Sequence, residues 1–233
     1  MITKSSKLCA ISYDIRGPIY QKSQEFAQQG VEVLQLNIGN PAPYGFQVPQ
    51  HLMQAVYSRL SEAQGYVASN GIEEARVAIQ QYATRKGIPC QTPQHVYIGN
   101  GVSELISISL QALLNPQDEV LLPSPDYPLW TSTVNLNGGT AVHYRCDEEA
   151  GWIPDLNDIR KKVTRKTKAL VLINPNNPTG AVYPKEFLEE LAQIARANQL
   201  LLLSDEIYDR IVYDGTVQHS TAAVAPDVPC ITY

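Results

Sequence analysis

The sequence predicts an α/β protein in which a mostly parallel β-sheet lies between two layers of helices. From residue 95 onward short aliphatic runs alternate with helical patterns, and runs such as Ala169–Ile173 and Leu200–Leu203 contain no polar residue. Continuous apolar runs are typical of strands that are buried on both faces, as in a parallel sheet covered by helices. Of the 233 residues 44% are hydrophobic and 18% are charged, so the chain can form a large core.

Each strand and helix of this α/β part is predicted from its own run of residues. The predicted strands are His95–Ile98, Glu119–Leu122, Ala141–Tyr144, Ala169–Ile173, Leu200–Leu203 and Cys230–Tyr233. The predicted helices are Ser103–Leu114 and Lys185–Asn198, in which apolar residues recur at helical spacing. A domain that stopped in the last strand would expose an unpaired edge and lack the next helix. We therefore expect the chain to be a fragment of a longer protein.

The N-terminal part lacks this regular alternation. The chain up to Pro49 is expected to be an extended, proline-rich arm, since Pro41, Pro43 and Pro49 exclude a regular helix around them. Two helices are expected next, near Gln50–Leu60 and Ile72–Lys86.

Composition and charge argue against several classes of protein. The formal net charge is −5, whereas a general nucleic-acid-binding surface needs lysine and arginine concentrated on one face. The four cysteines and four histidines are scattered and predict no metal site or disulfide framework. The start lacks the apolar stretch of a secretory signal, and the longest aliphatic runs are far shorter than the ~20 residues of a membrane span. We expect a cytoplasmic protein that binds neither nucleic acid nor membrane.

Unusual residues follow four of the predicted strands. Loops after parallel strands collect at the carboxyl edge of the sheet, where ligands bind. The glycines and free N–H groups of Gly99–Glu104 suit a phosphate, although an ordinary helix start explains this loop equally well. The loop Pro123–Trp130 holds Tyr127, whose ring face could stack on a planar ligand, although prolines end many strands.

The other two loops indicate a ligand more strongly. Asn174–Gly180 contains two Asn-Pro steps, which fix a turn that can aim an asparagine amide into the sheet edge. Asp205 closes the strand of leucines, so its carboxylate lies at the edge of a buried sheet, where an ion needs a partner. A cationic ligand group is one such partner, and a structural role as a helix N-cap is the simpler alternative. The spacing of Asn177 and Asp205 is close to one βαβ unit, which suits neighbouring strand ends.

Together these motifs resemble those of the class I/II aminotransferases, the fold-type I family that depends on pyridoxal 5′-phosphate. The ordered motifs are Asn-Ile-Gly-Asn-Pro from residue 37, Gly-Asn-Gly-Val-Ser-Glu from residue 99, Asp-Tyr-Pro from residue 126, Asn-Asn-Pro-Thr-Gly from residue 176 and Ser-Asp-Glu-Ile-Tyr from residue 204. Within the family, Tyr13–Pro18 and Asn37–Pro43 look most like the bacterial glutamate–pyruvate (alanine) aminotransferases. The resemblance implies a three-layer α/β/α large domain, with the small domain largely missing.

The resemblance also assigns a role to each matching residue. The cofactor would be held at its phosphate by Asn100, Gly101, Val102 and Ser103, at its ring face by Tyr127, at its 3-oxygen by Asn177 and Tyr208, and at its protonated ring nitrogen by Asp205. The substrates, an amino acid and a 2-oxo acid, would be bound by Gly39, Asn177 and Tyr13. Tyr66 matches the family tyrosine that reaches the phosphate of the neighbouring subunit, which implies a homodimer.

One residue that the family requires is absent. Its chemistry needs a lysine amine, as Schiff base to the cofactor and then as general base, in a Ser-Lys motif after the strand that follows Asp-x-x-Tyr. Here that strand is Cys230–Tyr233, and no lysine occurs after Lys185, which opens the helix before Asp205. We therefore assign no catalytic residue in this chain and expect the chain as given to be inactive.

The same resemblance predicts two domains. Residues 1–48 would form an N-terminal arm and a segment of the small domain. Residues 49–233 would form the pyridoxal-phosphate-binding large domain, incomplete at its C-terminal end.

The sequence supports one main function and two alternatives. The main hypothesis is the N-terminal part of an aminotransferase that exchanges the amino group between L-alanine and 2-oxoglutarate by a ping-pong route. The first alternative is a pyridoxal-phosphate-dependent C–S lyase or a related fold-type I enzyme, because the fold fixes the cofactor more firmly than the reaction. The second is a non-catalytic module of this fold that binds the cofactor or another protein.

Overall fold

The computed structural model describes residues 2–11, 17–35 and 39–233. The chain forms two compact units, one of Met1–Tyr13 with Asn70–Tyr233 and the other of Asp14–Ser69. The smaller unit contains helices α1 (Pro18–Gln28) and α2 (Gln50–Arg59), with 3-10 turns at Ala42–Tyr44 and Leu60–Gln64. The larger unit contains the sheet. The predicted division into residues 1–48, as arm and small-domain segment, and residues 49–233, as large domain, stays a prediction.

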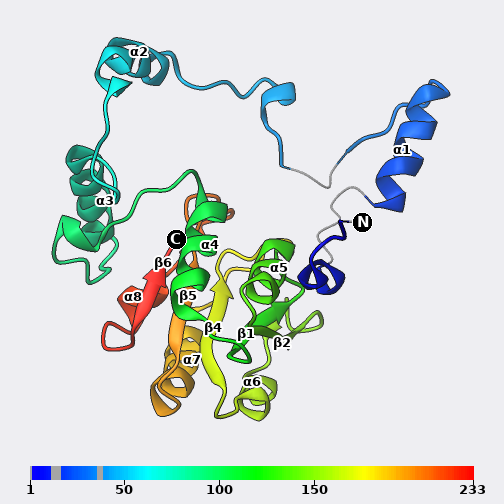
Figure 1. The fold of residues 1–233 in the computed structure, drawn as a ribbon, viewed down its shortest axis with the longest axis vertical. Helices are drawn as coiled ribbons and strands as arrows, with labels where there is room; N and C mark the ends of the chain where they lie inside the picture. Colours follow the sequence, from blue (N-terminus) through cyan, green and yellow to red (C-terminus); the bar gives the residue numbers. More distant parts are fainter. Residues whose placement is uncertain (1, 12–16, 36–38) are drawn as a thin grey trace. The chain divides into compact units, whose positions relative to one another are not determined.

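A six-stranded sheet forms the centre of the larger unit (Figure 1). Its strands are β1 (Glu119–Ser124), β2 (Thr140–Asp147), β3 (Ile153–Pro154), β4 (Thr167–Ile173), β5 (Leu201–Asp205) and β6 (Cys230–Thr232). Their order is β3-β2-β1-β4-β5-β6, and every pairing is parallel except that of β2 with β3. The mostly parallel sheet that the aliphatic runs predicted is therefore confirmed.

Helices cover both faces of this sheet. One face packs against α4 (Val102–Leu113) and α5 (Pro128–Leu136). The other packs against α6 (Leu156–Lys162), α7 (Lys185–Ala197) and the segment that follows α8 (Thr221–Val224). Successive residues of β4 alternate between the two cores, because side chains of a strand point to opposite faces. The three-layer α/β/α architecture is thus confirmed, and α3 (Glu73–Arg85) precedes it in the chain.

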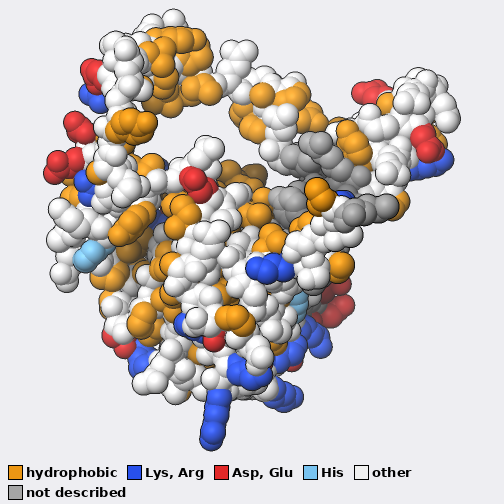
Figure 2. Space-filling view, viewed as in Figure 1, with side chains coloured by type: hydrophobic (Ala, Val, Ile, Leu, Met, Phe, Trp, Pro, Cys, Tyr) orange, Lys and Arg blue, Asp and Glu red, His pale blue; other side chains and the backbone are white. Residues whose placement is uncertain are grey.

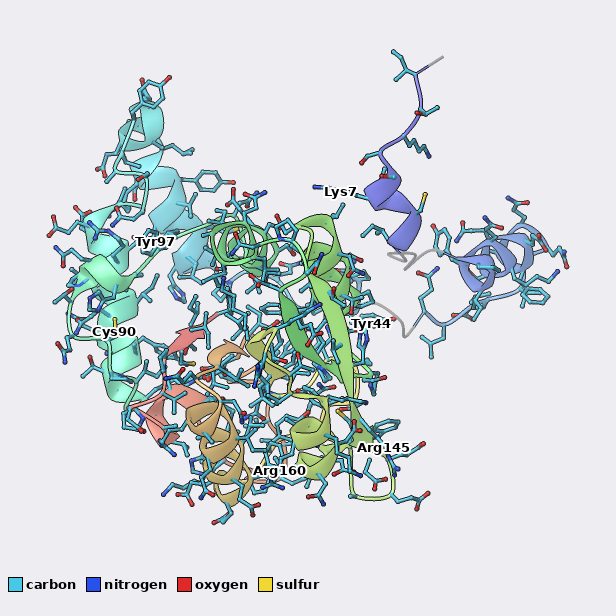
Figure 3. The ribbon with its side chains drawn as sticks, turned by 60° about the horizontal axis from the view of Figure 1, so that its bottom comes forward. Lys7, Tyr44, Cys90, Tyr97, Arg145 and Arg160 are labelled. Carbon is cyan, nitrogen blue, oxygen red and sulfur yellow. The ribbon has the colours of Figure 1, made fainter. Side chains whose placement is uncertain are left out.

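The strand predicted at His95–Ile98 is not formed. A 3-10 helix occupies Pro93–His95 instead, and Val96 is extended but belongs to no strand of the described sheet, which ends at β6 on this side. The backbone N–H of Ile98 donates one hydrogen bond, to the carbonyl of Asn70 at 3.1 Å, and this bond is not part of a strand pairing. Figure 3 shows Tyr97 on this segment between α3 and α4. A strand needs a neighbour to pair with, and the apolar run alone does not supply one.

The extended conformation predicted for the whole arm up to Pro49 is wrong for Pro18–Gln28, which form α1. Pro18 is the first residue of α1, and Pro128 is likewise the first residue of α5, which the sequence analysis also missed. Proline is favoured at this position, because its missing N–H would have no partner inside the helix anyway. Pro18 and Pro128 therefore mark the starts of helices that the spacing of apolar residues alone did not predict.

Apolar side chains stay exposed along α2, as the hydrophobic surface over this helix in Figure 2 shows. They include Leu52, Met53, Val56 and Tyr57, and no residue of α2 is buried. Among the helices of the described residues, none combines the length and the apolar character that crossing a membrane requires.

The alternation of β4 yields a test of the core. Leu170 is fully buried in the cluster that contains Leu188 and Leu191 of α7. Leu170→Ala is expected to lower the free energy of unfolding by about 2–5 kcal/mol, through lost burial and the cavity left behind. The control Leu136→Ala, at the partly exposed end of α5, is expected to change it by less than ~0.5 kcal/mol. Urea denaturation measures both, and equal losses would contradict the placement of Leu170.

Candidate functional site

Three neighbouring strands end at the edge that holds most of the predicted site. β1, β4 and β5 are adjacent and parallel, so their carboxyl ends meet at one edge of the sheet. Tyr127 follows β1, Asn177 follows β4 and Asp205 closes β5. Ile173 pairs with Asp205 in the β4–β5 register, and the N–H of Asn174 donates to the carbonyl of Asp205 at 2.9 Å. The topology thereby brings these three loops together.

Asp205 carries a buried carboxylate at this edge and is only 3% exposed. Its Oδ2 accepts the indole N–H of Trp130 at 3.1 Å, and its Oδ1 accepts the N–H of Ile207 at 3.4 Å. Burial raises the pKa of Asp205, and the charge of Glu206 adds to this. The two hydrogen bonds lower the pKa, but the net shift is upward. None of the ion pairs among the described residues includes Asp205. A buried carboxylate in this state lacks a cation.

The simpler alternative for Asp205, a helix N-cap, does not match the structure. Residues 207–210 form a turn and no helix follows β5 directly. The bond from Ile207 to Oδ1 is therefore a local turn contact, which leaves the charge of Asp205 uncompensated.

Trp130 is the residue of this site that sequence analysis missed. It lies on the first turn of α5, is completely buried, and its ring meets that of Tyr233 edge to face, with centroids 5.4 Å apart. Its N–H is the side-chain donor to Asp205. The sequence feature that could have indicated Trp130 is its position three residues after Tyr127, because residues three apart lie on the same side of a helical turn.

The loop after β1 holds Tyr127 half-buried against the core on the α4–α5 face. Its neighbour Asp126 accepts the hydroxyl proton of Thr131 through Oδ2, and Thr131 Oγ1 lies 2.8 Å from Nε2 of His143 on β2. These contacts tie the loop that carries Tyr127 to the adjacent strand.

The three asparagines after β4 have different roles. Asn174 is buried and joins two segments, since its Oδ1 accepts the N–H of Tyr183 at 3.0 Å and its Nδ2 donates to the carbonyl of His219 at 3.3 Å. Asn176 is buried and its Oδ1 accepts the N–H and hydroxyl of Thr179 at 3.3 and 2.9 Å. Asn177 is half-buried, so it is the asparagine of this loop that is best placed to meet a ligand.

Asn177 and Tyr208 line one cavity of about 380 Å³ in the larger unit. Gly180, Val182 and Tyr213 are also in its wall. Two residues predicted to share one ligand atom therefore face the same space, although they come from the loops after β4 and β5.

The start of α4 holds the predicted phosphate loop. Gly101 has φ 81° and ψ 169°, a conformation that is essentially restricted to glycine. The space where another residue would carry its Cβ is open, with no atom within 4 Å. Val102 and Ser103 begin the helix, where N–H groups lack an acceptor within the helix. The N–H of Asn100 is already bonded to the carboxylate of Glu104, so Gly101, Val102 and Ser103 are the better anion donors.

The structure gives three predicted residues no position relative to this site. Gly39 and Tyr66 belong to the smaller unit, and the side chain of Tyr66 is fully exposed. Tyr13 lies outside the described residues.

Comparisons with known proteins place this geometry in a family. The family model described as aminotransferase class I and II matches residues 31–233. Glutamate-pyruvate aminotransferase AlaA of Haemophilus influenzae is 56% identical over 232 residues, which are 100% of this chain and 57% of that protein. Alanine aminotransferase of Mycobacterium tuberculosis is 52% identical over 231 residues, which are 99% of this chain and 54% of that protein.

A solved structure agrees with the fold. The crystal structure of an aminotransferase from Escherichia coli superposes with a TM-score of 0.94 at 53% identity, over 100% of this chain and 57% of that chain. The chain thus spans little more than half the length of the relatives it matches. With a fold-type I sheet and a family match over most of its length, the chain belongs to the class I and II aminotransferase family.

Proposed function

We propose that this chain is the cofactor-binding part of a pyridoxal-phosphate-dependent aminotransferase that exchanges an amino group between L-alanine and 2-oxoglutarate. The observation that carries the proposal is the buried carboxylate of Asp205, which lacks a cation and lies at the same sheet edge as the loops of Tyr127 and Asn177. The family supports an amino-group transfer. The names of relatives that are 52% and 56% identical support alanine, pyruvate and glutamate as substrates.

The charge and the hydrogen-bonding groups of the predicted site residues support this cofactor. Asp205 would bind the protonated ring nitrogen, which supplies the missing cation. Gly101, Val102 and Ser103 would donate N–H groups to the phosphate at the positive end of α4. Asn177 and Tyr208 would hydrogen-bond the 3-oxygen from the cavity that both line. Tyr127 would lie against the ring face, on a loop tied to β2 through Thr131.

When bound, pyridoxal phosphate accepts the electrons released as the substrate Cα loses its proton. Asp205 favours that role only while it is ionised, because its negative charge keeps the ring nitrogen protonated. Trp130 supports the ionised form, since its N–H bond lowers the pKa that burial raises. Asp205 and Trp130 therefore act together on one atom of the cofactor.

The remaining assignments follow the family. Gly39 and Tyr13 would contact the substrate, and Tyr66 would reach the cofactor phosphate of the other subunit in a homodimer. Residues 49–233 would form most of the large domain, with residues 1–48 as arm and small-domain segment. The transfer would proceed by a ping-pong route, in which the amino group leaves the first substrate before the second binds, in a reducing cytosol.

We also propose that the catalytic lysine lies beyond residue 233. The chain spans 57% of AlaA of Haemophilus influenzae, which leaves room for a further domain in a longer protein. Reading the coding DNA past codon 233 tests this proposal. An in-frame Ser-Lys motif and a further domain would support it, whereas a stop codon and a stable, soluble product would favour the non-catalytic module.

The reaction itself is tested on the complete reading frame. With L-alanine and 2-oxoglutarate, we expect pyruvate and L-glutamate in equal amounts, and no free ammonia, because the amino group passes between substrates. Coupled assays for pyruvate, glutamate and ammonia measure all three. Pyruvate formed together with free ammonia would contradict the transfer and favour a lyase.

Asp205→Asn separates stability from function. The folded-state pKa of Asp205 lies above its ordinary value. In the pH window between the unfolded-state and folded-state pKa values, the folded chain therefore holds a proton that the unfolded chain has released. Its contribution to stability is therefore lost as pH rises through that window. At pH 7 the variant of the cofactor-free chain should be more stable by about 0.5–2 kcal/mol, and the gain should vanish in acid, below both pKa values. In the complete enzyme kcat/KM should fall by about 10²–10³-fold.

Urea denaturation across pH measures the stability, with Asp158→Asn as the control. Burial raises the pKa of Asp158, but the bonds from Lys162 and from the N–H of Arg145 lower it by more than burial raises it, so the net shift of the pKa is downward. Removal of its charge should therefore cost stability at pH 7. A loss of stability in Asp205→Asn at pH 7 would contradict the buried, unpaired charge.

The 233-residue chain alone is expected to form no site-specific covalent bond between one lysine and the cofactor. The lysine in the polar network after β5 is Lys86, which contacts Glu206 and Asp209. Burial lowers its pKa, but Asp209 and Glu206 raise it more, so its amine is held protonated and is not a nucleophile. Borohydride reduction in the presence of pyridoxal phosphate, followed by peptide mass spectrometry, tests this. A single uniquely labelled lysine would overturn the expectation.

A further inference from the structure

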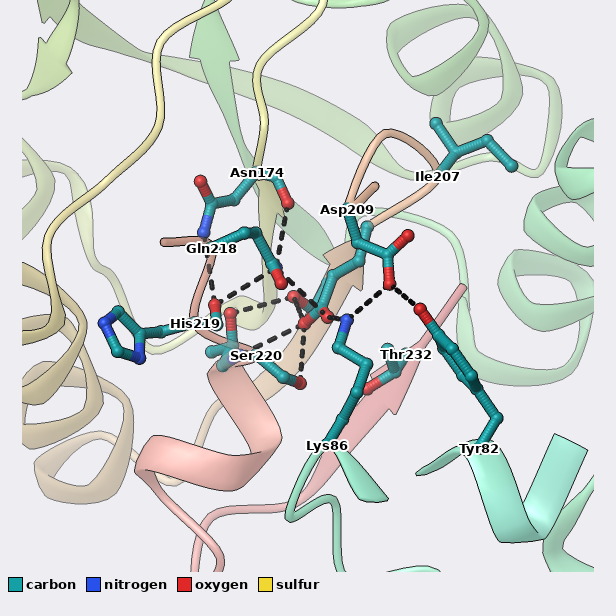
Figure 4. Close-up of polar contacts among 12 residues, drawn as sticks. Tyr82, Lys86, Asn174, Ile207, Asp209, Gln218, His219, Ser220 and Thr232 are labelled. Atoms are coloured by element: carbon teal, nitrogen blue, oxygen red, sulfur yellow. Dashed lines mark hydrogen bonds and ion pairs between the residues drawn. The ribbon is translucent and has the colours of Figure 1, made fainter. Parts of the chain in front are cut away.

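Lys86 lies just past the end of α3 and contacts two carboxylates of the loop after β5. Its Nζ is 3.0 Å from Oε2 of Glu206 and 2.8 Å from Oδ2 of Asp209 (Figure 4). The side chain of Lys86 is 18% exposed, that of Glu206 is 2% exposed and that of Asp209 is 14% exposed. Charges this far from water are held in a defined geometry, because each depends on the others for compensation.

Glu206 is fixed on its second oxygen as well. Oε1 accepts the hydroxyl protons of Ser204 and Ser220, each at 2.9 Å, and the N–H of Thr221 at 3.1 Å. On the other oxygen Gln218 adds a donor at 3.3 Å from Oε2. A carboxylate with this many donors has little freedom to move, so Glu206 provides a rigid attachment point for Lys86.

Asp209 is bound by α3 from two positions. Tyr82 donates its hydroxyl proton to the same Oδ2 that contacts Lys86. Tyr82 lies in the last turn of α3 and Lys86 follows that helix directly. The N–H of Asp209 closes a turn on the carbonyl of Glu206 at 2.9 Å. Between the two held carboxylates lie Ile207 and Tyr208, which are exposed.

We infer that Lys86 is a positioning residue for the cofactor site, because it binds both ends of the turn that carries Tyr208. The inference rests on the proposed function, which gives the Tyr208 hydroxyl a cofactor oxygen to hold. Without Lys86, Glu206 and Asp209 are two neighbouring carboxylates with no shared cation, and the turn between them loses its connection to α3. The Tyr208 hydroxyl then no longer stays in one position relative to Asn177 across the cavity.

The experiment compares lysine variants of the complete protein to which this chain belongs. Lys86→Met removes the charge and keeps the apolar stem, and Lys86→Arg keeps the charge. Lys168→Met is the matched control, since it breaks the 3.1 Å ion pair with Asp118 at the opposite, amino edge of the sheet. The amides of Asp209 and Ile211, bonded to Glu206 and Tyr208, report on the turn through hydrogen exchange without cofactor.

We expect Lys86→Met to speed exchange of these two amides by about tenfold or more, as local opening becomes easier. Lys86→Arg should stay close to the unchanged protein, and Lys168→Met should leave both amides protected. Unchanged exchange in Lys86→Met would overturn the inference. So would an equal acceleration in the strands of the core, which would show a general loss of stability.

A second readout links the turn to the cofactor. Titration of the protein with pyridoxal phosphate should show binding weakened by about tenfold or more in Lys86→Met, as expected when a supporting contact is lost. The pH midpoint of the cofactor's visible absorption change should rise, because a displaced Tyr208 no longer stabilises the ionised 3-oxygen. Normal binding and an unchanged midpoint in Lys86→Met would overturn the link.

Two safeguards keep the outcomes distinct. If Lys86→Met does not fold, Tyr82→Phe removes only the hydroxyl bond to Asp209 and should speed exchange in the same direction, and no change would overturn the inference. Failure of the unaltered protein to bind pyridoxal phosphate would refute the proposed function, while the exchange measurements without cofactor still decide whether Lys86 holds the turn.

Discussion

The burial of the Asp205 carboxylate is the constraint on which the rest of the site depends. β4 and β5 are apolar because the sheet is covered on both faces, so a charge at the end of β5 has no access to bulk water. Its surroundings must supply what water would have supplied, and they offer one indole N–H and one backbone N–H. The same layers that stabilise the sheet therefore create the demand for a cationic ligand at its edge.

The adjacent carboxylates of Asp205 and Glu206 are satisfied in different ways. Glu206 has Lys86, two hydroxyl groups and a backbone N–H, and needs nothing from outside the chain. Asp205 has neutral donors alone among the described residues. The two successive carboxylates at the end of β5 therefore have different roles. Glu206 connects the loop to Lys86 at the end of α3, and Asp205 is available to a cationic ligand.

Much of this arrangement is readable from the sequence, because buried parallel strands leave unbroken aliphatic runs. β1, β4 and β5 were predicted in this way, and the polar residues that follow each strand then mark the sheet edge. His95–Ile98 has similar local character but no strand to pair with, which no local pattern reveals. Lys86 and Glu206 are 120 residues apart, so their contact carries no sequence signal. The bond between Trp130 and Asp205 spans 75 residues and was missed for the same reason.

The donor to Asp205 is an indole, which neither gains nor loses a proton in water under ordinary conditions. A histidine at this place would donate a charge-assisted bond in acid and a neutral one, or none, near neutrality. Trp130 instead presents the same N–H at every pH at which the chain is folded, and its complete burial keeps competing water away. This donor to the carboxylate therefore does not change with acidity, so the hydrogen bond that favours the ionised form of Asp205 is present throughout the pH range of the folded chain.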